Sequence, residues 1–181
     1  MSWRDRIVEV SGQQWHPVSS AGFLGATVAV AVMAWLANTG ERWVHILDSA
    51  NLAFHEAGHP LAGLLFGADF AVYGGTLGQL VFPVVVAGSF WWRRQTLSFA
   101  LAIAWLLENF WNIARYMADA RARQLPLVGG GEHDWTEIFS RWNALQGDTR
   151  IAAFVTVTAW LGVLATWAWL TWRWRQDAQA R

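Results

Sequence analysis

Long apolar stretches without charged residues recur along this chain of 181 residues. Segment 151–172 has 22 residues and no charged side chain, and segments 21–37 and 74–92 are also uncharged. A helix needs about 20 predominantly apolar residues to cross the hydrocarbon core of a bilayer. Charged residues make up only 14% of the chain, compared with about 25% in ordinary soluble domains. The pattern predicts an all-α, polytopic membrane helix bundle in preference to a compact soluble helical bundle.

Two further segments are apolar but carry some polar residues. Segment 96–117 contains Glu108 and Arg115 as its only charged residues, and segment 43–66 is mostly apolar after Asp48. We therefore expect about five transmembrane helices, all in one integral membrane domain that covers residues 1–181. Their expected ranges are 21–37, 43–66, 74–92, 96–117 and 151–172, with a long polar loop at 118–150. An odd number of spans places the two chain ends on opposite faces of the membrane.

Tryptophan and arginine lie together where two of the expected spans end. Trp91 and Trp92 are followed directly by Arg93, and the last span ends in a similar mixture of these residues. Indole rings favour the headgroup region of a bilayer, and arginine reaches just beyond it. Membrane lipids are therefore expected partners. All 13 basic residues are arginine, which suggests a GC-rich genome, and we expect an integral protein of the bacterial inner membrane.

Charge and cysteine content argue against several functions. The net charge is zero, so no nucleic-acid partner is expected. The chain contains no cysteine, which excludes disulfides, thiolate ligands and cysteine catalysis. A metal site in this chain must therefore use histidine and carboxylate ligands.

The segment His55-Glu56-Ala57-Gly58-His59 has the pattern H-E-x-x-H. On a helix the two histidines are four residues apart, so they share one face and can chelate a single Zn²⁺ ion. Glu56 lies close by, where it can take a proton from an attacking water molecule. The alternative is a set of buried side chains hydrogen-bonded between helices, which is costly without a metal.

A third metal ligand is expected from a loop or from a neighbouring span, because catalytic zinc usually has three protein ligands. Segment 125–135 joins a Leu/Pro run to three glycines and then to His133. The glycines at 129–131 allow a sharp turn, so we expect the segment to fold back toward the two histidines. His133 is the first candidate ligand, and the alternative is a solvated loop histidine.

Two acidic residues are the next candidates for the third ligand. Asp119 ranks second, and its alternative role is an ion pair with Arg115 or Arg123 at the end of a helix. Glu108 ranks third, at about the same depth as the histidines, but pairing with Arg115 is the favoured interpretation for this residue.

Residues 54–63 resemble the metal-binding helix of the site-2-protease-like integral membrane zinc metallopeptidases, and residues 74–79 are similar to the Gly-rich start of the span that follows it. The resemblance extends over about residues 48–90, and its specific part is the H-E-x-x-H motif. It implies zinc-dependent cleavage of peptide bonds in or near the bilayer, with a transmembrane peptide as substrate.

The resemblance also bears on the remaining site residues. In that family the third ligand is an aspartate of an Asn-Pro-Asp-Gly or Leu-Asp-Gly motif. This chain has neither motif, and Asp119 is the nearest counterpart. Glu56 would be the catalytic base. Gln79 or Asn112 would donate to the developing oxyanion or orient the ligands, a role also open to Glu108.

Two other functions remain open at this point. One is a small membrane metallohydrolase that acts on a lipid or an amide, and the other is a non-catalytic accessory membrane subunit with a structural metal. An open coordination position facing Glu56 would favour an enzyme. A groove wide enough for an unwound peptide would favour the peptidase over the lipid or amide hydrolase.

Overall fold

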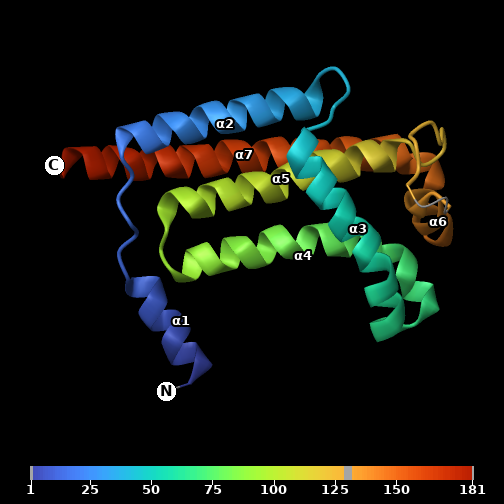
Figure 1. Cartoon of the computed structure of the whole chain (residues 1–181), viewed down its shortest axis with the longest axis horizontal. Helices are drawn as coiled ribbons and strands as arrows, with labels where there is room; N and C mark the ends of the chain where they lie inside the picture. Colours follow the sequence, from blue (N-terminus) through green and yellow to red (C-terminus); the bar gives the residue numbers. More distant parts are fainter. Residues whose placement is uncertain (1, 129–131, 181) are drawn as a thin grey trace.

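The computed structural model describes residues 2–128 and 132–180, so the glycine turn expected at 129–131 lies outside the described residues. Within the described part, the chain is all-α, with seven α-helices and two short 3₁₀ helices (Figure 1). The α-helices are α1 (Trp3–Gly12), α2 (Ser20–Asn38), α3 (His45–Phe66), α4 (Ala71–Trp92), α5 (Thr96–Ala118), α6 (Asp134–Arg141) and α7 (Asp148–Gln179). The 3₁₀ helices are η1 (Ala68–Phe70) and η2 (Leu145–Gly147).

Helices α2, α4, α5 and α7 run side by side and form the body of the molecule (Figure 1). Helix α5 packs against the other three. Its Ala104 and Leu107 lie in an apolar cluster with Val30 of α2 and Ala159 of α7. Ala159 is completely buried, and small residues of this kind let helix backbones approach closely.

Four candidate membrane spans are long and apolar enough to cross a bilayer. They are Ser20–Asn38, Ala68–Trp92, Thr96–Ala118 and Leu145–Gln179. Their positions agree with four of the five expected spans. Large apolar side chains on their outer faces are exposed, including Leu24, Phe154 and Leu164. A hydrocarbon environment accommodates such faces at no cost, whereas soluble proteins rarely expose large apolar patches.

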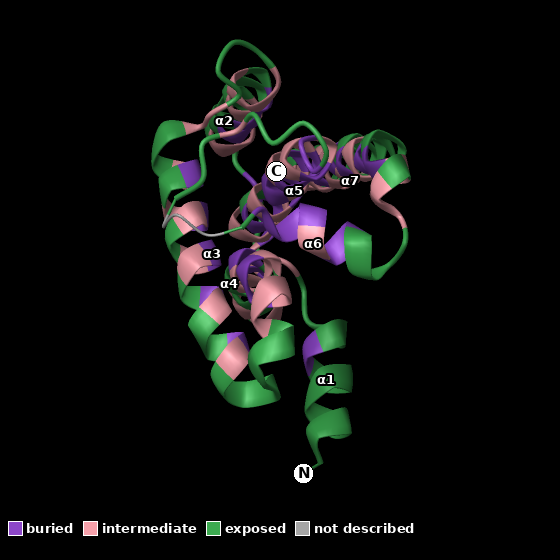
Figure 2. Cartoon of the chain, turned by 90° about the vertical axis from the view of Figure 1, so that its right-hand side faces the viewer, coloured by how far each residue is buried: buried purple, intermediate pink, exposed green. Residues whose placement is uncertain are grey.

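Helix α3 differs from these four helices and was expected to be the fifth span. It is 22 residues long, but its polar residues lower its mean hydropathy, and it is not among the four candidate spans. Figure 2 looks along the body of the molecule and shows α2 close to end-on, whereas α3 is seen from the side. In Figure 1 α3 also crosses the bundle steeply. The helix therefore lies across one end of the bundle instead of running along it.

The two chain ends lie at the same end of the bundle. The backbone N–H of Val18 donates to Oδ2 of Asp177 at 2.8 Å, and the ring of Phe23 stacks on Trp174 at 4.7 Å. This differs from the opposite-face arrangement that five spans would give. The reason is that α3 turns across the bundle, so only four helices run along it.

Segment 118–150 was expected to be a long polar loop, but part of it forms a buried helix. Trp135, Ile138 and Phe139 of α6 are almost fully buried, in a cluster with Ile113 of α5 and Ala152 of α7. Their spacing of three and four residues puts them on one helical face. This packing fixes the start of α6 beside α3.

Candidate metal centre

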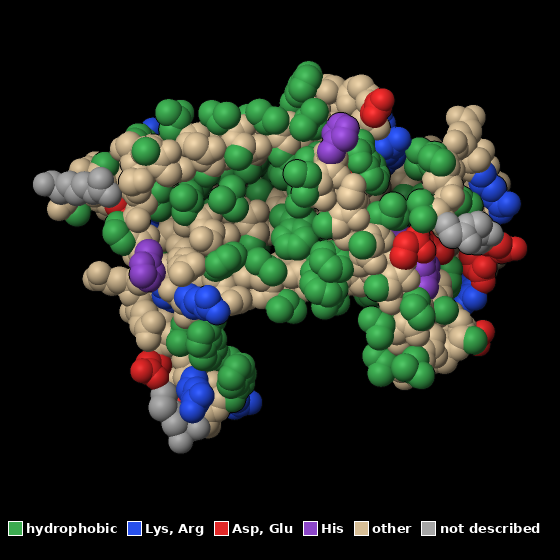
Figure 3. All heavy atoms as spheres, in the orientation of Figure 1, with side chains coloured by type: hydrophobic (Ala, Val, Ile, Leu, Met, Phe, Trp, Pro, Cys, Tyr) green, Lys and Arg blue, Asp and Glu red, His purple; other side chains and the backbone are tan. Residues whose placement is uncertain are grey.

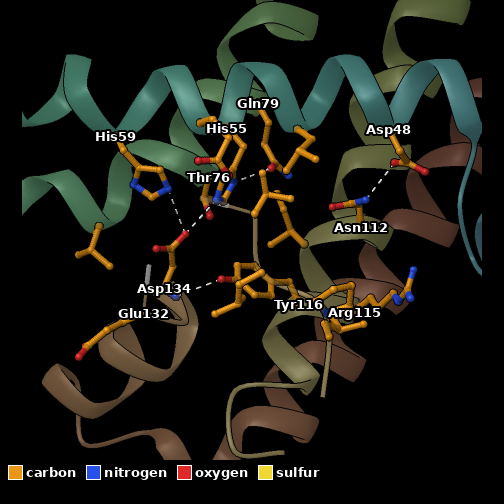
Figure 4. Close-up of a pocket in the computed structure, with 18 of the residues that line it drawn as sticks. Asp48, His55, His59, Thr76, Gln79, Asn112, Arg115, Tyr116, Glu132 and Asp134 are labelled. Atoms are coloured by element: carbon orange, nitrogen blue, oxygen red, sulfur yellow. Dashed lines mark hydrogen bonds and ion pairs between the residues drawn. The ribbon is translucent and has the colours of Figure 1, made fainter. Parts of the chain in front are cut away.

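Three potential ligands meet between α3 and α6. His55, His59 and Asp134 offer ligand atoms that all lie within 4.8 Å of one another. Oδ2 of Asp134 is 2.9 Å from Nε2 of His55 and 3.4 Å from Nε2 of His59 (Figure 4). The expected pairing of the two histidines on one face of a helix is confirmed, and Asp134 joins them from another element.

Hydrogen bonds on the far side of each imidazole direct both Nε2 atoms toward the aspartate. Nδ1 of His55 lies 3.0 Å from Oε1 of Gln79, and Nδ1 of His59 lies 2.8 Å from the carbonyl oxygen of Ala71. A proton on each Nδ1 satisfies the carbonyl oxygen beside it, which leaves Nε2 of each ring to face Asp134. With neutral rings, two lone pairs and a carboxylate then point at the same place. A cation between them would stabilise this arrangement.

Gly75 of α4 lets both imidazoles pack directly against the helix backbone. A Cβ atom at residue 75 would lie 2.5 Å from Nε2 of His55 and 2.6 Å from Nε2 of His59, so any side chain there would displace both rings. The donor chemistry of the group, two imidazoles and one carboxylate, fits a metal ion.

Small residues bring α4 this close to α3. A Cβ at Gly58 would collide with the carbonyl oxygen of Gly74, and a Cβ at Gly78 would collide with that of Phe54. Glycines let two helix backbones approach to contact distance. The Gly-rich start of α4 thus positions Gly75 against both imidazoles.

Asp134 is held by the first turn of α6. Its backbone N–H donates to the hydroxyl of Tyr116 at 3.1 Å. Burial alone would raise the pKa of Asp134, but its hydrogen-bond contacts with His55 and His59 hold this pKa below its ordinary value. A metal ion bound here would act in the same direction, because positive charge favours the carboxylate.

The structure does not bring His133 and Asp119 into this group. Nε2 of His133 lies 3.4 Å from Oδ2 of Asp119, so these two residues pair with each other. His133 precedes the first residue of α6, and its Nδ1 accepts from the backbone N–H of Thr136 at 3.3 Å. Burial lowers the pKa of His133, which keeps the ring neutral.

Asp119 has a local structural role. Its two carboxylate oxygens accept the backbone N–H groups of Gln124 at 2.9 Å and Leu125 at 3.0 Å. The side chain thereby orders the turn that follows α5. The ranking from the sequence put His133 first and Asp119 second as third ligand, whereas the structure gives that position to Asp134.

A sequence signal for Asp134 exists in the segment after it. The apolar residues Trp135, Ile138 and Phe139 have helical spacing, and this spacing predicts a helix that begins near residue 134. In such a helix residue 133 is the cap, and its side chain turns back to the helix backbone. The next residue is then free to face a neighbouring element.

Glu108 is fully buried and takes part in a separate polar network. Its Oε2 accepts a hydrogen bond from Nδ2 of Asn51 at 2.8 Å. The favoured pairing with Arg115 is not found, because Nη1 of Arg115 donates to the carbonyl oxygen of Arg42 at 2.9 Å. Glu108 therefore links α5 to α3 through Asn51, which precedes the histidine pair on α3.

The two candidate oxyanion donors have different surroundings. Nδ2 of Asn112 donates to Oδ1 of Asp48 at 2.9 Å, so one of its two N–H donors is already used. Gln79 lies beside His55, with its oxygen on Nδ1 of that ring. Gln79 is thus the residue of this pair that contacts the metal group.

The metal group opens into a cavity of about 500 Å³. Glu56, which is next to His55 but outside the ligand group, contributes to its wall. Residues 125–128 line the same cavity, so the expected return of this segment toward the histidines is confirmed for its described part. Figure 3 shows acidic side chains gathered around a histidine at the end of the molecule that holds α6.

No protein-family model, curated protein or solved structure matches the chain. The only indication of its chemistry is therefore the arrangement of its own residues. They form an all-α, membrane-like protein with a potential metal-binding group of His55, His59 and Asp134.

Proposed function

We propose that this protein is a zinc-dependent hydrolase of the membrane, which cleaves peptide bonds in or near the bilayer in the manner of the site-2-protease-like metallopeptidases. The observation that carries the proposal is the convergence of Nε2 of His55, Nε2 of His59 and a carboxylate oxygen of Asp134 on one point. Gly75 has no side chain that would push the two imidazoles away from that point. Two imidazoles and one carboxylate, with a further position open, are a typical ligand set of catalytic zinc.

Each residue of the site has a role in hydrolysis. Zinc, when bound, supplies positive charge that polarises the scissile carbonyl and activates the attacking water. Glu56 accepts a proton as the water oxygen adds to the carbonyl carbon, and it passes that proton to the leaving nitrogen as the C–N bond breaks. The products are a carboxylic acid and an amine. Gln79 and the carbonyl of Ala71 hold the two imidazoles in the orientation that the ligands need.

The substrate is proposed to be a transmembrane peptide, with membrane lipids around the four apolar helices. The bacterial inner membrane is the proposed location. The location of the metal group at one end of the bundle, between α3 and α6, supports cleavage close to a membrane surface. The cavity of about 500 Å³ accommodates a short unwound segment.

A second candidate is a hydrolase that acts on a lipid or an amide of low molecular weight. The volume of the cavity favours it, since pockets for small molecules range from about 300 to 1,000 Å³. A purely structural metal is less well supported, because Glu56 lines the cavity beside the ligand group and is not one of its members.

The metal site is tested by measuring zinc in purified protein. We expect about one zinc per chain, and its loss in His55→Ala, His59→Ala and Asp134→Ala, because each variant removes one of three ligands. His45→Ala is a matched control, since His45 is exposed at the start of the same helix. Full zinc occupancy in the His55→Ala/His59→Ala double variant contradicts the site.

The catalytic assignment is tested with Glu56→Gln. We expect this variant to keep its zinc and to lose turnover by a factor on the order of 10² or more, because Gln cannot accept the proton. Hydrolysis of a panel of transmembrane peptides and acylated amides in detergent is the measurement. Undiminished turnover in Glu56→Gln contradicts an enzyme of this mechanism, and loss of zinc in that variant makes Glu56 a structural residue.

A further inference from the structure

Helix α4 presents two buried polar groups to the metal centre that have no partner among the described residues. They are the hydroxyl of Thr76 and the amide nitrogen Nε2 of Gln79. Both residues line the cavity, and Figure 4 shows them beside His55. Residues three apart lie on the same face of a helix, so the two groups face the site together.

The hydroxyl of Thr76 differs from that of four other helical threonines in this chain. Those at positions 27, 156, 158 and 166 each donate to the carbonyl oxygen four residues earlier. Such a bond satisfies a hydroxyl within its own helix. Thr76 makes no such bond and lies instead against the metal group. Its donor is therefore available to an acceptor that enters the site.

Gln79 uses one end of its amide and leaves the other end unused. Its Oε1 lies 3.0 Å from Nδ1 of His55, which fixes the orientation of the amide group. Nε2 then carries two N–H donors with no acceptor, on a residue that is only 4% exposed. Buried donors without acceptors are rare in native proteins and indicate a missing partner.

We infer that Thr76 Oγ1 and Gln79 Nε2 together bind the carbonyl oxygen of the substrate and stabilise the negative charge that develops on it. This inference rests on the proposed hydrolase function. As water adds to the carbonyl carbon, the C=O π electrons move to the oxygen, and two fixed donors stabilise that charge. Asn112 is less suited to this role, because it lies beside Asp48, to which it donates, and away from the histidine pair (Figure 4). Gln79 thus orients His55 with its oxygen and contacts the substrate with its nitrogen.

The test compares two probes that bind to a cobalt(II)-substituted protein and change its visible absorption spectrum. Methylphosphonate offers anionic oxygens like those of the reacting carbonyl, whereas ethanethiol binds through sulfur and offers no oxygen. Thr76→Val removes only the hydroxyl and is expected to weaken methylphosphonate binding about tenfold or more, the effect of one hydrogen bond to a charged group. Ethanethiol binding should be unchanged, and Thr76→Ser should restore methylphosphonate binding.

Gln79→Glu keeps an oxygen for His55 but removes the N–H donors. Its new charge repels both anionic probes, so the expected signature is a larger loss for methylphosphonate than for ethanethiol. Thr158→Val is the matched control, because this exposed hydroxyl donates to Phe154 on α7. It should leave both affinities unchanged.

Metal content separates failure of this inference from failure of the proposed function. Equal methylphosphonate affinity in wild type and Thr76→Val, with full cobalt occupancy in both, overturns the oxyanion role and leaves the metal site intact. Loss of cobalt in Thr76→Val also overturns it, because the hydroxyl then supports the metal group and not the ligand. Absence of cobalt from the wild-type protein overturns the proposed function itself.

Discussion

At the scale of single residues, the site depends on a position that has no side chain. Gly75 lies against both imidazoles, and a methyl group there would fall within 2.6 Å of the Nε2 atoms of His55 and His59. The absence of a side chain at residue 75 allows both imidazoles to lie against α4 with their Nε2 atoms near Asp134. The candidate metal group therefore depends on the backbone of α4 as well as on the motif in α3.

Gly75→Ala should abolish zinc binding although every proposed ligand is retained, because the added methyl group clashes with both imidazoles and pushes them out of position. Helix propensity alone would favour alanine by about 1 kcal/mol, so a general loss of helix stability is not expected. Gly88→Ala is the matched control, since a Cβ at this position of α4 meets no atom within 4 Å. Zinc analysis of both variants checks the prediction, and stoichiometric zinc in Gly75→Ala would refute it.

At the scale of elements, the short helix α6 completes the site. It carries Asp134, and it is held in place by a buried apolar face that includes Ile138 and Phe139. The cap at His133 and the bond from Asp134 N–H to Tyr116 set the position of its first turn. The third potential ligand is thus fixed by the packing of α6 against α5.

Phe139→Ala should weaken zinc binding at least tenfold although Phe139 is not a ligand. Phe139 is fully buried, and truncation of a buried Phe costs about 3–5 kcal/mol, which loosens α6 and with it Asp134. Phe154→Ala makes the same change at a side chain that is 73% exposed on α7, and it should leave zinc affinity unaltered. Competition with a zinc chelator measures both affinities. Equal affinities in the two variants would show that α6 does not control the site.

At the scale of the whole molecule, the path of α3 sets the topology. Four helices run along the bundle, and α3 crosses one end of it (Figures 1 and 2). Both chain ends consequently lie at the end away from the metal group, where Val18 contacts Asp177. A fifth span in place of this crossing helix would separate the chain ends.

The topology is testable with single cysteines, because the chain contains none of its own. Ser11→Cys and Ala178→Cys should react with a membrane-impermeant maleimide from the same side of sealed vesicles, and Thr39→Cys should react from the opposite side. All three positions are exposed. Labelling of all three in detergent is the control for reactivity. If residues 11 and 178 react from opposite sides, α3 spans the membrane and the five-span arrangement holds.

Much of this architecture can be predicted from short segments of the sequence. Uncharged segments of about 20 residues identify four helices, and the H-E-x-x-H spacing identifies two of the three potential ligands, because each signal is a property of a single helix. The Gly-rich start of α4 is also visible as a pattern, although its contact with the imidazoles is not.

Only the tertiary structure decided the third ligand and the course of α3. Two adjacent residues of the segment after α5 have different roles: His133 caps α6, whereas Asp134 faces His55. The docking of α6 against α5 determines which of the two side chains faces α3. The polar face of α3 likewise forms hydrogen bonds to α5 and α4, and these contacts hold the helix across the end of the bundle. The sequence by itself determines which segments are helical and apolar, because helical periodicity and apolar composition depend on residues that are close together in the chain. The meeting of a histidine pair with a carboxylate 75 residues away depends on packing between helices, which local sequence does not encode.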